Sequence, residues 1–305
     1  MYLYFYQKKR KVNNDKILPA PCFISIEPTN FCNLKCPACP SGNGELSRER
    51  GFMDFSLFKK IIDDQKDTLI NIIFHFQGEP LLHKELGRMI NYAKENNIYT
   101  MFSTNAQLLA EKTDMIKESG PDKIIISLDG ITQESYNKYR INGDINKIYS
   151  ALKNLSGLKD GKRPFIELQF LVFSHNINEI PEVKKLKKKY KIDRITFKSV
   201  QIYDNSQINM LPADEKYLRY EVSDGNFRLR SDLRNKCHRI IFGSVITWNG
   251  NVVPCCFDKD AEYITGNAGN EKLNDIRNDN KYKTFINSVF SHRDKIEICK
   301  NCTEF

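Results

Sequence analysis

Short apolar runs alternate with amphipathic stretches through the first two thirds of the chain. The apolar runs are rich in β-branched and aromatic residues, which predicts buried strands at 23–27, 69–76, 98–103, 123–128, 165–173 and 194–198. Apolar residues three or four positions apart predict helices at 55–65, 85–96, 108–119, 145–158 and 180–190. This alternation predicts an α/β fold whose parallel sheet is either open or rolled into a partial barrel.

The alternation ends near residue 200, and the chain beyond it has a different pattern. Residues 201–235 are polar and irregular, so we expect a linker with some helix. Asn249-Gly250 separates two β-rich runs within 244–255, which predicts a hairpin. A helix is expected over 273–289. The predicted segments are a lead-in at 1–20, a barrel at 21–200, a linker at 201–235 and a small hairpin-plus-helix domain at 236–305.

The composition suits a folded domain without a membrane span. The 305 residues are 40% hydrophobic, and no run approaches the roughly 20 apolar residues that cross a bilayer. The aromatic residues 1–6 precede the basic residues 7–11, which reverses the order of a signal peptide, so we expect a cytoplasmic protein. We expect a packed terminal segment there, and a peripheral membrane contact is the alternative.

The formal net charge of +9 identifies no single partner. Many of the lysines lie at 184–191, where they predict the solvated face of a helix. No nucleic-acid recognition module accompanies them, so no nucleic-acid partner is expected. An anionic substrate or an acidic electron-transfer protein is equally compatible with this charge.

Three of the nine cysteines form a C-x3-C-x2-C pattern directly after the first predicted strand: Cys32, Cys36 and Cys39. Without an export signal, clustered cysteines indicate metal binding in a reducing compartment. Three thiolates on one loop can hold three irons of a cubane cluster and leave the fourth iron open. A tetrahedral zinc site would need a fourth ligand, and no adjacent Cys or His supplies one.

A second set of cysteines lies near the end of the chain. Its members are Cys237, Cys255 or Cys256, Cys299 and Cys302. Four thiolates can close an iron–sulfur cluster or a zinc site, and the spacing alone does not separate the two. Cys22 is expected to be a buried, inert thiol.

Polar residues follow several of the predicted strands. In parallel sheets, sites lie at the carboxyl ends of the strands, so these residues should meet at one rim. They are the cysteine loop, the motif Gly78-Glu79-Pro80 and Asn105. His75, Gln77 and Lys198 also lie at strand ends, where they line the cavity or serve the fold.

Together, the cysteine triplet, the Gly78-Glu79-Pro80 motif and the second cysteine set resemble the radical S-adenosylmethionine (SAM) superfamily, in its SPASM/twitch branch with one auxiliary cluster. The resemblance implies a partial (β/α)6 barrel, two 4Fe–4S clusters and SAM as cofactor. The Cys237-x17-Cys255 spacing resembles the one-cluster pattern, which favours Cys255 as ligand and leaves Cys256 outside the cluster.

The resemblance also implies the residues that contact SAM. Gly78, Glu79 and Pro80 match the motif that binds the amino group. Ser103 and Asn105 match the ribose-contacting motif, with Ala106 in place of its usual glycine. Ser127, Asp129 and Arg140 match the segment that reaches the ribose and the SAM carboxylate. A guanidinium suits that carboxylate, although Asp129 could instead cap a turn and Arg140 could form a surface pair.

One departure from the family pattern concerns the adenine. The residue before the third cysteine is often aromatic in this superfamily and packs near the adenine, but here it is Ala38. Phe102, Leu171 and Val200 are the candidates for that contact.

The implied chemistry begins with an electron from a flavodoxin- or ferredoxin-type donor. SAM is then cleaved to a 5′-deoxyadenosyl radical, which abstracts a hydrogen atom from the substrate, and the protein positions the reactants. The auxiliary cluster can take an electron from the substrate radical, which gives an oxidation. Alternatively, Cys256 returns a hydrogen atom and gives an epimerisation; the competing interpretation is that Cys256 only packs.

The substrate is expected to be a small polar molecule such as a sugar or aminocyclitol. Peptide-modifying members often carry an extra peptide-binding domain, and the roughly 20 residues before the first strand leave no room for one. A maturase that modifies a peptide or protein is the alternative. A metal-binding protein without turnover is a third, and the Gly78-Glu79-Pro80 motif argues against it.

Overall fold

A computed structural model of the chain describes residues 17–158 and 164–303. The aromatic and basic lead-in, on which the idea of a membrane contact rests, lies largely outside these residues. Within them, no helix combines the length and the apolar character needed to span a bilayer.

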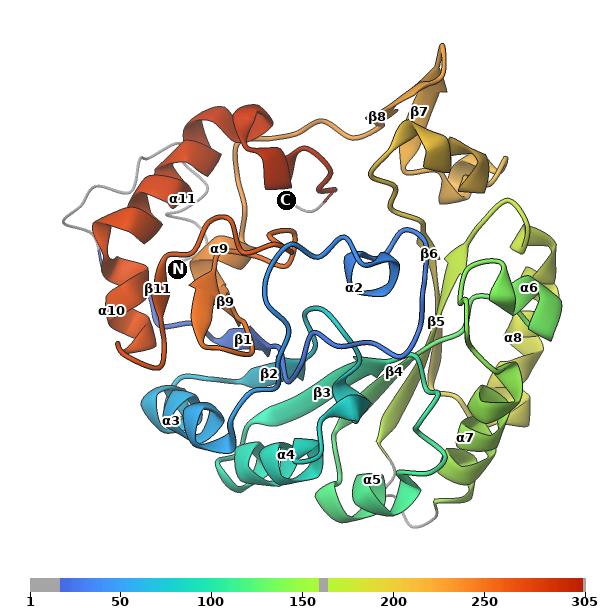
Figure 1. Cartoon of the computed structure of the whole chain (residues 1–305), viewed down its shortest axis with the longest axis horizontal. Coiled ribbons are helices and arrows are strands. Elements are labelled where there is room, and N and C mark those ends of the chain that lie inside the picture. The colour runs from blue at the N-terminus through green and yellow to red at the C-terminus, as the bar shows by residue number, and fades with distance from the viewer. Residues whose placement is uncertain (1–16, 159–163, 304–305) are drawn as a thin grey trace.

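Six parallel strands, each paired with the next along the chain, form a curved sheet. They are β1 (Phe23–Ile26), β2 (Asn71–Phe74), β3 (Tyr99–Thr104), β4 (Lys123–Ser127), β5 (Phe165–Val172) and β6 (Arg194–Ser199). In Figure 1 the helices lie along the outer side of this curve. The predicted partial (β/α)6 barrel is confirmed.

Six helices surround the barrel in the described part of the chain, and side chains cap the start of three of them. They are α3 (Phe55–Gln65), α4 (Leu86–Glu95), α5 (Thr113–Ser119), α6 (Gln133–Asn137), α7 (Ile145–Gly157) and α8 (Ile180–Lys189). Asp54 caps α3 by accepting a hydrogen bond from Ser56 N, and Asp144 caps α7 in the same way. The helix predicted at 108–119 begins only at Thr113, and α6, which starts at a Thr132 capping box, was not predicted.

The strands bury one face against these helices. On β2, β3 and β4 the outward side chains are 0% or nearly 0% exposed, while their inward neighbours are half-buried, apart from the exposed Tyr99 at the start of β3. Phe102 is 0% exposed and packs in the core between sheet and helices. The prediction that Phe102 packs on the adenine is therefore wrong, because its side chain lies on the face of β3 away from the barrel interior.

The predicted linker contains a hairpin as well as short helices. Two 3-10 turns, η3 (Asn205–Met210) and η4 (Glu215–Tyr217), precede β7 (Tyr220–Ser223) and β8 (Asn226–Leu229). Asp224 and Gly225 join these strands with φ angles of 51° and 72°. Both angles suit a type I′ turn, so the Asp-Gly pair was a signal that the sequence interpretation missed.

The C-terminal strands extend the barrel sheet. α9 (Arg239–Phe242) leads into β9 (Gly243–Ile246), which pairs in parallel with β1, and β10 (Asn251–Val253) and β11 (Gly266–Asn267) continue the sheet outward. Gly250 has φ 87° in the predicted Asn249-Gly250 turn. This arrangement places the cysteine-rich segment beside the first strand of the barrel (Figure 1).

The predicted helix at 273–289 is two helices. α10 (Leu273–Asn278) and α11 (Asn280–His292) meet at Asp279, whose carboxylate accepts a hydrogen bond from Lys281 N and starts the second helix. The turns η5 (Arg293–Lys295) and η6 (Glu297–Cys299) then lead to the last cysteines.

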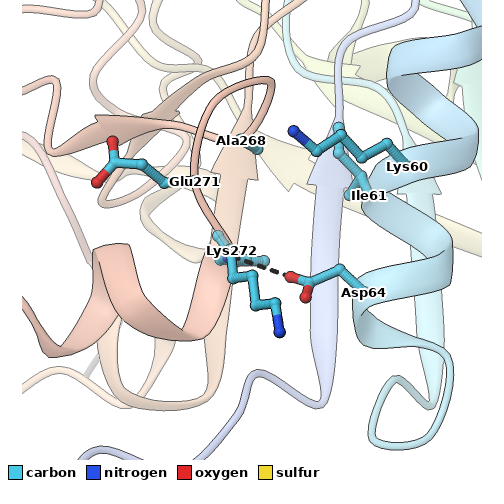
Figure 2. Close-up of a pocket in the computed structure, with 7 residues that line it drawn as sticks. Lys60, Ile61, Asp64, Ala268, Glu271 and Lys272 are labelled. Carbon is cyan, nitrogen blue, oxygen red and sulfur yellow. Dashed lines mark hydrogen bonds between the residues drawn. The ribbon is translucent and has the colours of Figure 1, made fainter.

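Buried Arg277 of α10 holds β9 in place. Its guanidinium donates to the carbonyls of Gly243 and Ile241, to Ser244 Oγ and to Tyr282 OH. A small cavity of about 210 Å³ lies nearby, between α3 and the C-terminal segment. Figure 2 shows the residues that line it. There Asp64 Oδ2 accepts from Leu273 N at 2.9 Å, which joins the two parts of the chain.

Candidate active site

The cysteine loop lies between β1 and the short helix α2 (Pro40–Asn43), at the carboxyl ends of the strands. Nitrogen donors point at two of its sulfurs. Cys32 Sγ accepts from Leu34 N at 3.5 Å and from Asn105 Nδ2 at 3.8 Å, and Cys36 Sγ accepts from Arg140 Nη1 at 3.7 Å. Hydrogen bonds to cysteine sulfur are a means by which proteins tune iron–sulfur clusters, so this donor set fits one.

The three thiols of this loop influence one another. Burial raises the pKa of Cys32 to about 12, and the thiols of Cys39 and Cys36 act in the same direction. Burial also raises the pKa of Cys36, against the opposing charge of Arg140. A bound metal deprotonates such thiols. In the described part of the chain, no three His, Cys, Asp or Glu side chains converge on a single-ion site.

The Gly78-Glu79-Pro80 motif is joined to the cysteine loop through its backbone. Gly78 N donates to Ser41 Oγ at 3.0 Å, and Glu79 N donates to Phe31 O at 2.8 Å. Gly78 has φ 77°, and a Cβ there would lie 2.5 Å from Thr29 O. A glycine is therefore required where β2 ends against the cysteine loop.

The Glu79 carboxylate links the ends of β2 and β3. It is 2% exposed and accepts from Leu81 N at 3.0 Å, Thr104 Oγ1 at 2.7 Å and Asn105 N at 2.7 Å. Burial raises the pKa of Glu79, and these donors oppose that shift. Within the described chain, both carboxylate oxygens are thus engaged in holding the rim together.

Ser103 and Asn105 lie where the ribose motif was predicted. Ser103 is half-buried on the inward face of β3, and Asn105 Nδ2 donates to Asn33 Oδ1 at 2.7 Å. Ala106 has φ 61°, in the left-handed region that favours glycine. The conformation explains why a glycine is usual at this position, and this chain adopts it with an alanine.

Asp129 and Arg140 form a buried ion pair behind the cysteine loop. Asp129 is 0% exposed; its Oδ2 accepts from Arg140 Nε at 2.6 Å and its Oδ1 from Leu171 N at 2.7 Å. Burial disfavours the charged guanidinium, but Asp129 and Cys36 outweigh it and hold the pKa of Arg140 well above its usual value. The pair is thus neither a surface pair nor a turn cap. Ser127 is half-buried on the inward face of β4.

Leu171 and Val200 remain candidates for contact with the adenine. Both belong to an apolar cluster that includes the three loop cysteines, Tyr139 and Phe173. Leu171 is half-buried, whereas Val200 is 1% exposed. Leu171 therefore offers the more accessible surface beside the cysteine loop.

The C-terminal cysteines also lie near one another. Burial raises the pKa of Cys255, and Cys237 and Cys299 add to the shift. Burial raises the pKa of Cys299 to about 11, opposed by Arg293, while Cys237 and Cys302 act with burial. Cys237, Cys255 and Cys299 also belong to one apolar cluster, and Cys302 lies within electrostatic reach of Cys299.

Cys256 is exposed and directly follows Cys255, a member of this second set. Tyr203 lies near it: partial burial raises the pKa of Tyr203 to about 12, and Cys39 and Cys256 contribute to the shift, although 48% of the residue is exposed. Tyr203 is thus within electrostatic reach of Cys39 in the first set and of Cys256 beside the second. Cys22 is half-buried and donates to Phe242 O at 3.6 Å.

A buried ion pair that the sequence analysis missed connects the two cysteine-bearing parts. Glu27, at the end of β1, accepts from Arg48 Nη1 at 2.7 Å and from Trp248 N at 3.2 Å. Arg48 Nε donates to Lys259 O at 2.7 Å, and Asp260 accepts from Ser47. These partners are far apart in sequence, so no local pattern could have predicted them.

The comparisons with known proteins agree with this geometry. The family described as the radical SAM superfamily matches residues 26–197, and SPASM, an iron-sulfur cluster-binding domain, matches residues 237–303. The chain belongs to the radical SAM superfamily. It is a radical SAM enzyme whose cofactors are 4Fe–4S clusters and SAM, as the resemblance implied.

Individual relatives of this radical SAM enzyme have different activities. GTP 3′,8-cyclase of Clostridium botulinum is 28% identical over 56% of the chain, and the chain spans only 54% of that relative. The S-adenosyl-L-methionine-dependent 2-deoxy-scyllo-inosamine dehydrogenase of Niallia circulans is 25% identical over 92% of the chain and 91% of its own length. Among solved structures, Streptococcus suis SuiB bound to S-adenosylmethionine has a TM-score of 0.68 at 19% identity, covering 94% of this chain and 73% of SuiB, which shows a shared fold.

Proposed function

We propose that this radical SAM enzyme oxidises a small polar substrate of the sugar or aminocyclitol kind. The observation that carries the proposal is the similarity to 2-deoxy-scyllo-inosamine dehydrogenase, which extends over 92% of this chain and 91% of that relative. The partly polar inward face of the barrel strands supports it, with Ser103 and Ser127 on that face.

Three groups of residues would hold the cofactors. Cys32, Cys36 and Cys39 would bind the first cluster, and Cys237, Cys255, Cys299 and Cys302 the second. Gly78, Glu79 and Pro80 would form the pocket for the SAM amino group, Ser103, Asn105 and Ser127 would face the ribose, and Arg140, held by Asp129, would pair with the SAM carboxylate. When bound, these cofactors supply the radical that abstracts hydrogen.

The chain's own residues contribute position and charge. Glu79 keeps the ends of β2 and β3 together, so that the groups facing SAM stay at fixed distances from the cysteine loop. Arg140 brings a cation to the Cys36 sulfur. Electrons would arrive from a flavodoxin- or ferredoxin-type protein in the cytoplasm.

Anaerobic reconstitution tests the proposal. We expect about eight irons per chain and reductant-dependent formation of 5′-deoxyadenosine. Cys39→Ala should lose four irons and SAM cleavage together, whereas Cys299→Ala should lose four irons and keep SAM cleavage. Substrate oxidation should disappear in both variants. Zinc in the second site, with oxidation intact, would contradict the proposed role of the auxiliary cluster.

Cys256 distinguishes oxidation from epimerisation. Cys256→Ala should leave oxidation unchanged if the side chain only packs. If Cys256 instead donates hydrogen, the variant should still form 5′-deoxyadenosine but lose the epimerised product. Deuterium incorporation from D2O into recovered sugar, measured by mass spectrometry, separates the two outcomes, and Cys22→Ala is the control.

A peptide substrate is the second candidate function, and a separate cavity favours it. The cavity has a volume of about 390 Å³ and lies between the β7–β8 hairpin and the C-terminal segment, where Tyr203, Phe257 and Asn301 line it. Such a cavity could take a peptide side chain. Phe257→Ala should then weaken peptide binding, and it should leave the oxidation of a small substrate unchanged if our first proposal is correct.

A further inference from the structure

The inner surface of the barrel is accessible at the rim that carries the site. On β3, Met101 and Ser103 are half-buried between fully buried neighbours, and on β4 Ile125 and Ser127 repeat the pattern. Since side chains alternate between the two faces of a strand, these half-buried positions all face inward. A small molecule that reaches the interior therefore meets inward side chains at the strand ends.

His75 presents an unused polar atom near this surface. It directly follows β2, and its Nδ1 is buried without a hydrogen-bond partner in the described residues. Burial lowers the pKa of His75 to about 4, and the positive charges of Arg140 and Lys198 act in the same direction. His75 is therefore neutral, and it lies within electrostatic reach of both cations.

Lys198 faces the same interior from β6. It is in register with Leu171 of β5, and Leu171 packs in the cluster that contains Cys32 and Cys39. Two residues earlier on the same face, Thr196 donates to Glu167 at 2.7 Å. Lys198 thus lies two residues beyond Thr196 along β6, closer to the carboxyl ends of the strands, where the cysteine loop lies.

The cations of this region differ in whether a carboxylate pairs with them within the described part of the chain. Arg140 has Asp129 as its partner, and Glu167 has Lys123 at 2.7 Å. No described carboxylate pairs with Lys198. An ammonium on the inward face of the barrel favours a ligand with negative charge, and charge-assisted hydrogen bonds give such pairing its strength.

We propose that Lys198 and His75 form a substrate subsite for a small hydroxylated molecule that carries a carboxylate or phosphate. Lys198 pairs with the anionic group, and His75 Nδ1 takes a hydrogen bond with one hydroxyl. The inference rests on the proposed small-molecule function and narrows its substrate class. Within the sugar or aminocyclitol class it favours an acidic substrate over one whose only charge is an ammonium, because the Lys198 ammonium would repel a protonated amine.

Calorimetric titration of the reconstituted, SAM-loaded enzyme tests the subsite under anaerobic conditions. The probes are glucuronate, glucose 6-phosphate, glucose and glucosamine, which share a ring and differ in charge. We expect the two anions to bind at least tenfold more tightly than glucose, and glucosamine most weakly. Lys198→Met should remove this preference, while His75→Phe should weaken all four probes about equally. Lys187→Met, on the outer surface of α8, is the charge-matched control and should change nothing.

Two further measurements separate the possible failures. Formation of 5′-deoxyadenosine in each variant shows that the fold and the radical machinery remain intact. Inorganic phosphate, titrated alone, reports the anion subsite without a sugar. If phosphate binding depends on Lys198 but none of the four sugar probes binds, the anion subsite is supported and the proposed function is refuted. Glucosamine binding as tightly as glucuronate, or anion binding unchanged in Lys198→Met, would overturn the subsite.

Discussion

Arg140 donates from Nη1 to the sulfur of Cys36 across 3.7 Å. The same guanidinium is held by Asp129 at 2.6 Å, so its position relative to the cysteine loop is set by a buried partner. If Cys36 binds the first cluster and Arg140 the SAM carboxylate, as we propose, this cation would affect both the reduction of the cluster and the binding of SAM. The first prediction concerns this cation.

Replacement of Arg140 should lower the reduction potential of the first cluster. A reduced cluster carries one more negative charge, and a nearby cation stabilises it. We expect Arg140→Gln to shift the potential downward and to weaken SAM binding at least tenfold, as measured by redox titration with electron paramagnetic resonance and by SAM titration. Arg88→Gln, on the surface of α4, is the control. An unchanged potential would contradict this assignment.

Asp129→Asn should destabilise the protein more than a surface substitution does. It leaves the Arg140 guanidinium buried without its carboxylate, and breaking a buried pair in this way costs about 3–5 kcal/mol. Denaturant unfolding measures the change. The exposed pair of Lys185 and Glu182 gives a matched comparison, since Glu182→Gln should change the free energy of unfolding by less than about 1 kcal/mol.

Glu79→Gln should weaken the rim between β2 and β3. The carboxylate accepts three hydrogen bonds, and an amide nitrogen in place of one oxygen would face a donor, leaving a buried polar group unpaired at a cost of about 1–3 kcal/mol. Thr104→Ser keeps the hydroxyl that donates to Glu79 and accepts from Ala106 N, so its effect should be smaller. Equal losses of unfolding free energy in the two variants would refute the role given to Glu79.

Ala106→Gly should be close to neutral or slightly stabilising. The left-handed conformation at φ 61° costs an alanine about 1–2 kcal/mol, which outweighs the roughly 0.8 kcal/mol contributed by its buried methyl group. Ala106→Val adds a β-branched side chain at the same φ and should destabilise clearly. In thermal unfolding, the melting temperature should be unchanged or higher for Ala106→Gly and lower for Ala106→Val.

His75 should make stability depend on pH between about 7 and 5. Its pKa is about 4 when folded, below the value of 6.5 in an unfolded chain, so the unfolded state binds the proton first. Its stabilising contribution is therefore complete above pH 6.5 and falls by about 2 kcal/mol between pH 7 and pH 5. His75→Phe should flatten this slope in denaturant unfolding at each pH, with cluster absorbance monitored. An equal dependence of the unfolding free energy on pH in His75→Phe would contradict the assignment of this dependence to His75.

Local patterns predicted much of the barrel correctly, and the failures have local causes too. The strand and helix alternation located all six barrel strands, and Asn249-Gly250 identified the β9–β10 turn. The predicted helix at 273–289 failed because Asp279 competes for the backbone as a cap. Phe102 was misassigned because strand periodicity shows which residues share a face but not which face the helices cover.

The sequence by itself determined the cofactor chemistry, because the cysteine spacings and the Gly78-Glu79-Pro80 motif act over short stretches of chain. The tertiary structure alone decided what surrounds them. The pairing of β9 on β1, the contact of Arg48 with Glu27 and Lys259, and the hydrogen bond of Asn105 to Asn33 join residues from distant parts of the sequence. Such contacts follow from strand order and register, which no short window of the sequence contains.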